Sequence, residues 1–180
     1  IILGGTLGES SVLSQEEKIT LTRETVNYVN GRVPVILNIA EGATQDALFW
    51  AKKAEELGAS GLMILPPMRY GADAREVVAY FKAVANSTRL PMMIYNNPVD
   101  YKTLVTLDMF AELADCPNIQ AIKESTRDIS NVTRMFNRFG DRFQILCGVD
   151  TLALEELLMG AVGWVAGLVC AFPKETVVIY

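Results

Sequence analysis

The feature that most constrains the fold of this chain is a regular alternation of short apolar runs with amphipathic helical patterns. The runs are rich in Ile, Val, Leu and Met and barely alternate with polar residues, which is typical of strands buried on both faces of a parallel sheet. One strand and one helix recur about every 20–30 residues, as in right-handed βαβ units. The predicted strands are residues 1–3, 34–40, 61–66, 91–96, 119–124, 143–148 and 163–168.

The helical patterns carry their own start signals. Ser14-Gln15-Glu16-Glu17 predicts a capping box, in which the serine hydroxyl and the glutamate carboxylate each bind a free backbone N–H group. Short polar residues also stand ahead of the other apolar stripes, where they can cap the first turn of a helix. These residues are Thr44, Asp73, Thr106, Asp128 and Thr151.

Seven strand–helix units in series leave two architectures open, a doubly wound sheet and a (β/α)₈ TIM barrel. A barrel requires an eighth strand, and the chain starts inside a strand. The barrel prediction therefore includes a missing first βα unit and missing C-terminal helices. No linker or low-complexity segment divides the chain, so we expect residues 1–180 to form a single, partial domain.

The composition excludes several classes of function. The net charge of −5 and the lack of a basic cluster argue against a nucleic-acid partner. No apolar stretch reaches the ~20 residues of a membrane span, and we expect no signal peptide. The three cysteines lie far apart, which favours a reduced, cytoplasmic protein. The chain has no histidine, so an enzyme built on it must use Lys, Tyr, Ser, Thr, Cys or carboxylates.

Lys123 is the first candidate for chemistry, because it ends a predicted strand, and active sites of α/β folds lie at the carboxyl ends of strands. By period-two alternation, Ile119, Ala121 and Lys123 share one face. If that face lines a barrel, desolvation lowers the pKa of the ammonium and frees an amine that can form a Schiff base with a ketone. The alternative is a lysine that snorkels, its stem covering apolar surface.

Two further strand ends supply candidate partners. Tyr95 ends the preceding strand, and adjacent strands lie about 4.8 Å apart, so its phenol could reach the amine. A tyrosine here could also be a packing residue whose hydroxyl is satisfied. The turn "GGTLGES" exposes backbone N–H groups that suit a carboxylate, and Thr6 adds a hydroxyl, although many glycine-rich turns are only tight turns. It matches neither nucleotide-binding motif, so we expect no nucleotide cofactor.

In order along nearly the whole chain, "GGTLGES", "YNNP", "IKES" and "GVD" resemble segments of the dihydrodipicolinate synthase / N-acetylneuraminate lyase family of Schiff-base aldolases. The resemblance implies a (β/α)₈ barrel with C-terminal helices, in which the predicted strands are strands two to eight. It also implies a homo-oligomer, a dimer or usually a tetramer. The activity implied is that of a lyase that acts on a small 2-oxo acid or cyclic imine acid.

The resemblance also implies roles for particular residues. Lys123 would be the amine that condenses with the keto group, Tyr95 the general acid and base, and Thr6 part of a hydroxyl relay. No metal and no organic cofactor are implied, because the protonated imine is itself the electron sink. The implied substrate-binding residues are Gly5, Leu7, Gly148 and Val165.

Three departures from the family pattern bear on the substrate. Leu7 replaces a threonine, Met68 replaces a relay tyrosine supplied across a subunit interface, and Asp100 replaces a substrate-binding arginine. An aspartate there would repel a second carboxylate, which disfavours the lysine-pathway synthase.

The segments "LMILPPMRY", "YNNPVDYKTLVT" and "GAVGWVAGLVCAFPKE" are similar to the pyrroline-4-hydroxy-2-carboxylate deaminase subgroup. This implies that the lysine attacks a ring imine, and that loss of the 4-hydroxyl group and of ammonia gives 2,5-dioxopentanoate. Three alternatives remain open. They are a pyruvate-dependent aldolase or synthase, a 2-keto-3-deoxy sugar-acid dehydratase, and a non-catalytic member that binds 2-oxo acids.

Overall fold

The computed structural model describes all 180 residues and contains one parallel sheet of seven strands. The strands pair in chain order, each with the next, so the two ends of the series form the two edges of the sheet. All the predicted strands are present, most of them shorter than predicted. They are β1 (Ile2–Leu3), β2 (Ile36–Ile39), β3 (Gly61–Ile64), β4 (Met92–Asn96), β5 (Ile119–Glu124), β6 (Gln144–Cys147) and β7 (Gly163–Trp164).

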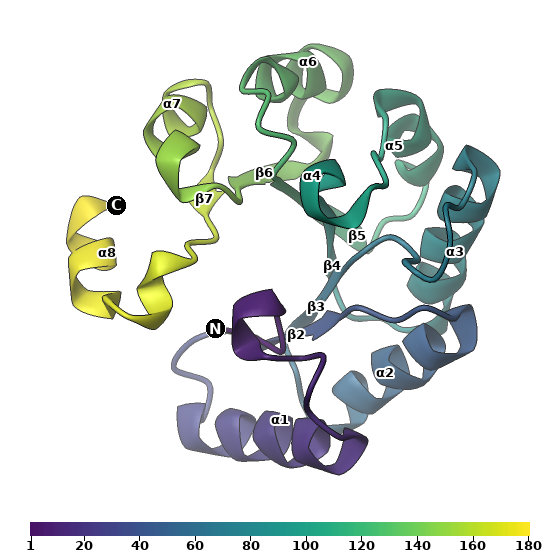
Figure 1. Cartoon of the computed structure of the whole chain (residues 1–180), viewed down its shortest axis with the longest axis vertical. Helices are drawn as coiled ribbons and strands as arrows, with labels where there is room; N and C mark the ends of the chain where they lie inside the picture. Colours follow the sequence, from purple (N-terminus) through teal and green to yellow (C-terminus); the bar gives the residue numbers. More distant parts are fainter.

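Except for the short α4, which lies inside the ring, the helices form an outer layer around the strands, and the ring is open on the side that holds both chain ends (Figure 1). A doubly wound sheet reverses its strand order and carries helices on both faces, so the structure is an open barrel of the TIM type instead. The helices are α1 (Gln15–Val29), α2 (Thr44–Glu56), α3 (Ala74–Ser87), α4 (Pro98–Tyr101), α5 (Leu107–Leu113), α6 (Ser130–Phe139), α7 (Ala153–Leu158) and α8 (Pro173–Ile179).

Three of the predicted helix caps are confirmed. The side chains of Ser14 and Asp73 each form a full capping box, with Glu17 and Glu76 as the third helical residues. Thr106 accepts a hydrogen bond from the N–H of Met109 at the start of α5. Each bond satisfies a backbone donor that has no partner inside the helix, so these sequence signals fix where the helices begin.

Three of the predicted caps were wrong, each by one residue. Thr44 is the first residue of α2, and the N-cap is Ala43, which makes no side-chain bond. Asp128 lies one residue before the N-cap of α6, because its carboxylate binds the N–H and hydroxyl of Ser130 within the loop. Thr151 lies within the 3-10 turn η3 (Asp150–Leu152), which separates it from α7.

The apolar residues form two separate cores. A cluster of 28 buried residues fills the layer between the sheet and the helices. A smaller cluster of Met63, Leu65, Met93 and Tyr95 lies on the other face of the sheet, inside the barrel. Met92 and Ile94 belong to the outer cluster, so the side chains of β4 alternate between the two cores.

A bulge in β5 corrects the predicted alternation there. Met92 of β4 pairs with Ile119, but Met93 pairs with Ala121, so Gln120 is an extra residue on β5. An extra residue in a strand interrupts the alternation of its side chains. The residues before the bulge therefore face the opposite way from the simple prediction. Ile119 therefore packs in the outer cluster, and the prediction that it shares the face of Lys123 was wrong. Ala121 does pack against the inner cluster.

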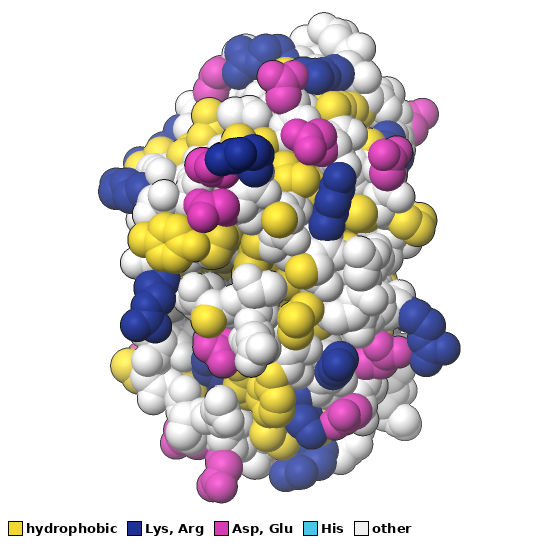
Figure 2. All heavy atoms as spheres, turned by 90° about the vertical axis from the view of Figure 1, so that its right-hand side faces the viewer, with side chains coloured by type: hydrophobic (Ala, Val, Ile, Leu, Met, Phe, Trp, Pro, Cys, Tyr) yellow, Lys and Arg dark blue, Asp and Glu magenta, His cyan; other side chains and the backbone are white.

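The molecular surface mixes both signs of charge. Figure 2 shows lysine and arginine side chains interspersed with aspartate and glutamate side chains on one face, with no patch of a single sign. Nucleic-acid-binding surfaces instead concentrate positive charge. None of the helices combines the length and the apolar character of a membrane span.

Candidate active site

The carboxyl ends of the strands surround a pocket of about 400 Å³. Its walls come from segments far apart in the sequence, because parallel strands present all their carboxyl ends at one rim. The structure brings every predicted site residue to this pocket. They are Gly5, Thr6, Leu7, Tyr95, Lys123, Gly148 and Val165.

Lys123 lies inside the pocket and is only 9% exposed. Its strand position pairs with Tyr95 of β4, and its Nζ atom lies 3.7 Å from the centroid of the Tyr95 ring. Burial lowers the pKa of the Lys123 ammonium to about 8, although Asp150 and Cys147 oppose the shift. A larger fraction of this amine is therefore neutral near physiological pH than for a solvated lysine, and the neutral amine is the nucleophilic form.

The hydroxyl of Tyr95 is oriented by its neighbour Asn97. The Asn97 side-chain amide donates a hydrogen bond of 3.1 Å to the Tyr95 Oη atom. The Asn97 Oδ1 atom accepts the N–H of Asp100 at 3.2 Å, so the amide nitrogen must face the phenol. Because the phenol oxygen is the acceptor of this bond, its own proton stays free to donate to a bound ligand.

The hydroxyl of Thr6 binds a residue that the sequence analysis missed. Its Oγ1 atom forms a hydrogen bond with the Oη atom of Tyr101, at the end of α4. The Tyr101 ring packs edge to face on Tyr95, with the ring centroids 5.6 Å apart. Burial raises the pKa of the Tyr101 phenol, so this hydroxyl stays protonated. The available signal was its place in "YNNPVDY", three residues after Pro98.

The predicted binding loop forms the short 3-10 turn η1 (Thr6–Gly8). Leu7 is 68% exposed and its side chain has no polar group, so only its backbone can form hydrogen bonds with a ligand. Met68 and Asp100, the two other departures, occupy different places. Met68 packs against the inner cluster and is not part of the pocket, whereas Asp100 lines the pocket.

The loop after β7 is held by Asp150. One carboxylate oxygen accepts hydrogen bonds from the Trp164 ring nitrogen at 3.1 Å and from the N–H of Gly167 at 2.9 Å. The other accepts the N–H of Leu168 at 2.9 Å. These bonds fix the segment that carries Val165 into the pocket wall. No group of three or more His, Cys, Asp or Glu side chains is arranged to hold a metal ion.

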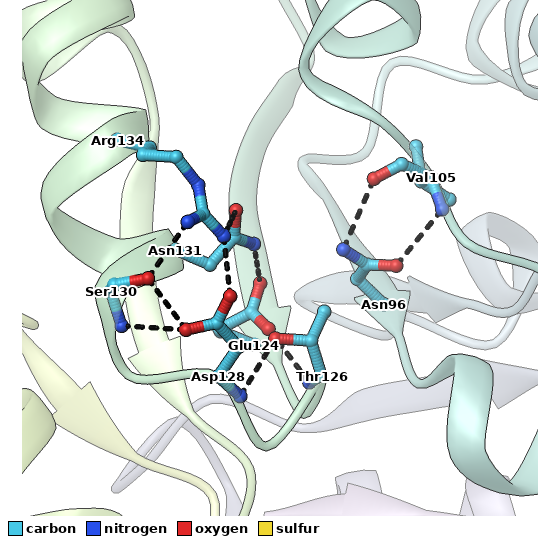
Figure 3. Close-up of polar contacts among 8 residues, drawn as sticks. All are labelled: Asn96, Val105, Glu124, Thr126, Asp128, Ser130, Asn131 and Arg134. Carbon is cyan, nitrogen blue, oxygen red and sulfur yellow. Dashed lines mark hydrogen bonds and ion pairs between the residues drawn. The ribbon is translucent and has the colours of Figure 1, made fainter.

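Glu124 supports the loop that follows Lys123. Its carboxylate is fully buried, and burial raises its pKa. One oxygen accepts the N–H of Thr126 at 2.7 Å, and the other accepts the side-chain amide of Asn131 at 2.9 Å (Figure 3). Glu124 thus ties the end of β5 to the first turn of α6.

We expect Glu124→Ala to destabilise the protein by about 3 kcal/mol, because it leaves buried donors on Thr126 and Asn131 without an acceptor. Urea unfolding of the full-length protein measures this change. Glu112 is exposed, so Glu112→Ala should change the free energy of unfolding by less than about 0.5 kcal/mol. Equal stability of the two variants would contradict the role of Glu124.

Comparisons with known proteins agree with this architecture. The family model for the dihydrodipicolinate synthetase family matches residues 1–180. The 4-hydroxy-tetrahydrodipicolinate synthase of Bacillus subtilis is 38% identical over 167 residues, which cover 92% of this chain and 58% of the relative. That of Clostridium perfringens (strain ATCC 13124) is 35% identical over 176 residues, which cover 98% of this chain and 60% of the relative.

Solved structures agree as well. Dihydrodipicolinate synthase from Aquifex aeolicus superposes with a TM-score of 0.93 at 32% identity, over 97% of this chain and 60% of that one. The chloride-inhibited dihydrodipicolinate synthase from Acinetobacter baumannii, in complex with pyruvate, has a TM-score of 0.93 at 29% identity. The match covers 97% of this chain and 60% of that one. This chain thus spans about three fifths of the length of these relatives. With its sequence matched from end to end and its fold shared with solved members, the chain belongs to the dihydrodipicolinate synthetase family.

Proposed function

We propose that this chain is the larger part of a Schiff-base lyase in which Lys123 condenses with a small 2-oxo acid. The observation that carries the proposal is the buried Lys123 amine, with its pKa lowered to about 8, lying against Tyr95 in the pocket. Family membership supports it, and a relative from Acinetobacter baumannii has been solved in complex with pyruvate. We take residues 1–180 as one partial domain that contributes strands two to eight of an eight-stranded barrel.

In the proposed reaction, the neutral Lys123 amine forms a bond to the keto carbon of the substrate. The keto oxygen takes up protons and leaves as water, and a protonated imine remains. This imine draws electrons from the adjacent carbon, so that carbon can lose a proton and form an enamine without a metal or an organic cofactor. The enamine can then attack a second carbonyl compound or expel a hydroxyl group from the next carbon. The free proton of the Tyr95 hydroxyl makes this residue the proposed acid and base. The Thr6 hydroxyl, bonded to Tyr101, would complete the relay.

The remaining pocket residues are proposed to hold the substrate. The backbone amides of Thr6 and Leu7 would bind its carboxylate, while Gly5, Gly148 and Val165 would form the walls around it. An assembly into dimers or tetramers is proposed from the family.

Two reactions fit this chemistry. A pyruvate-dependent synthase or aldolase has in its favour the names of the relatives, which are synthases. Deamination of a pyrroline-4-hydroxy-2-carboxylate is the second candidate. It is favoured by Asp100, whose carboxylate lines the pocket where a second substrate carboxylate would be repelled.

The experiment that tests the proposal uses the full-length protein. We expect a covalent increase in intact mass when the protein is treated with borohydride in the presence of pyruvate or of the pyrroline acid. Assays of ammonia, pyruvate and semialdehyde release would then separate deaminase from aldolase. Tight binding of 2-oxo acids with no trapped adduct and no turnover would instead identify a non-catalytic member.

The pH dependence of trapping gives a separate prediction. Because burial lowers the pKa of Lys123 from 10.5 to about 8, the neutral fraction of the amine should rise about tenfold per pH unit below pH 8 and level off above it. The initial trapping rate at low pyruvate concentration, measured from about pH 6 to about pH 10, should follow this curve. A rate that is still rising tenfold per unit above pH 9 would show an ordinary lysine.

A further inference from the structure

Arg127 is the exposed cation of the pocket, and its side chain has no partner. The pocket holds four charged residues, Lys123, Arg127, Asp100 and Asp150. Asp150 accepts three hydrogen bonds, and Asp100 accepts the Asn97 amide at 2.7 Å. Lys123 is buried, whereas Arg127 is exposed and takes part in none of the ion pairs or side-chain hydrogen bonds of the structure. Its guanidinium is therefore free to bind an anion.

The backbone of Arg127 is unusual for a residue with a side chain. Its φ angle is +64°, in the left-handed region that disfavours residues other than glycine. The three other non-glycine residues with positive φ, Glu9, Asn30 and Lys102, each end a helix, where this conformation is common. Arg127 lies in the loop between β5 and α6 and ends no helix. Strained residues of this kind cluster at functional sites.

The neighbours of Arg127 hold it in this conformation. On one side, the N–H of Thr126 is bound to the buried carboxylate of Glu124. On the other side, the carboxylate of Asp128 binds Arg134 at 2.6 Å (Figure 3). Both flanking residues, Thr126 through its backbone N–H and Asp128 through its carboxylate, are thus engaged in the network at the start of α6, while Arg127 lines the pocket.

We propose that Arg127 binds a carboxylate at the end of the substrate remote from the keto group, so that among 2-oxo acids longer than pyruvate the site prefers diacids to monoacids of the same length. The inference rests on the proposed function, since it assumes that the keto carbon is held at Lys123. Lys123 is 9% exposed while Arg127 is exposed, so an extended acid would place its far end near Arg127. The planar guanidinium matches a carboxylate with two parallel hydrogen bonds.

Two observations favour a longer substrate with a second carboxylate, one from the volume of the pocket and one from its charges. The pocket volume of about 400 Å³ is in the range that holds molecules well above the size of a three-carbon acid. The nearby Asp100 does not neutralise Arg127, because no ion pair joins them and the Asp100 carboxylate is bonded to Asn97. The guanidinium is thus available to offset the repulsion that Asp100 exerts on a second carboxylate.

The test compares 2-oxoglutarate with 2-oxopentanoate, which has the same chain length but lacks the second carboxylate. Borohydride trapping on the full-length protein gives the half-saturating concentration of each acid. We expect a lower value for 2-oxoglutarate in the wild type. Arg127→Gly and Arg127→Gln should each raise it about tenfold or more, since a charged hydrogen-bonded pair is lost, and should change the value for 2-oxopentanoate less than twofold.

The two variants separate charge from backbone strain. Arg127→Gly should raise the melting temperature, because glycine adopts a φ of +64° without strain, whereas Arg127→Gln should not. Lys102→Gly is the matched control: it also replaces a cation at positive φ, at +62°, but outside the pocket. It should leave the half-saturating concentrations of both acids unchanged.

The outcomes are distinguishable. If the Arg127 variants change the half-saturating concentrations of the two acids equally, or change neither, the role of Arg127 is overturned. The proposed function still stands in that case, provided that the wild type forms a trapped adduct. The absence of any adduct in the wild type, with pyruvate included, would overturn the proposed function and this inference together.

Discussion

Replacement of Lys123 by alanine or arginine should abolish the borohydride-trapped adduct and lower turnover by on the order of 10³-fold or more. Alanine has no amine, and arginine keeps the positive charge but cannot be deprotonated to become a nucleophile. If Lys123 acts only as a buried cation that positions the substrate, Lys123→Arg should retain much of the activity. Trapping and initial rates of the full-length variants measure the difference.

The same variants should fold. Lys123→Ala removes an ammonium whose charge is disfavoured by burial, so we expect no large fall in melting temperature. Lys52 is exposed, and Lys52→Ala serves as a control that should trap pyruvate like the wild type. A trapped adduct that persists in Lys123→Ala would assign the Schiff base to another lysine.

The second large effect is expected for Gly148→Ala. A methyl group at Gly148 would lie 2.0 Å from the Ser125 Oγ atom and 2.8 Å from two carbon atoms of Lys123. The backbone has little room to retreat, since the N–H of Gly148 donates to the carbonyl of Glu124 at 2.7 Å. The methyl group must therefore displace both the Ser125 hydroxyl and the Lys123 side chain, and displacements of about 1 Å can lower rates about 100-fold. We expect that loss in trapping rate, with a destabilisation of about 1–3 kcal/mol.

Gly71→Ala is a suitable control. A methyl group at Gly71 would meet nothing within 4 Å, and this residue does not line the pocket. The variant should keep the trapping rate and the stability of the wild type. If Gly148→Ala also traps pyruvate at the wild-type rate, the position of Lys123 in the pocket is not as critical as proposed.

The parts of the fold that could be predicted depend on local signals. The continuous apolar runs predicted every strand, because parallel strands are buried on both faces. Ser14 and Asp73 predicted helix starts, because their caps are made within the next turn. Lys123 and Tyr95 could be paired because both end neighbouring strands, and the register aligns them.

The features that sequence could not predict depend on contacts between distant residues. The bulge at Gln120 exists only in the pairing of β5 with β4, so a simple alternation misplaced Ile119. The bond between Thr6 and Tyr101 joins residues 95 positions apart. The left-handed conformation of Arg127 likewise depends on the network around Glu124 and Asp128, and the residue type alone gives no sign of it.

The most direct test of the account is to locate the reduced pyruvate adduct by peptide mapping of the full-length protein. The account predicts one modified residue, Lys123, with a yield that falls in step with the neutral fraction of its amine below about pH 8. An unmodified Lys123, or a modification spread over exposed lysines such as Lys52 and Lys174, would contradict it.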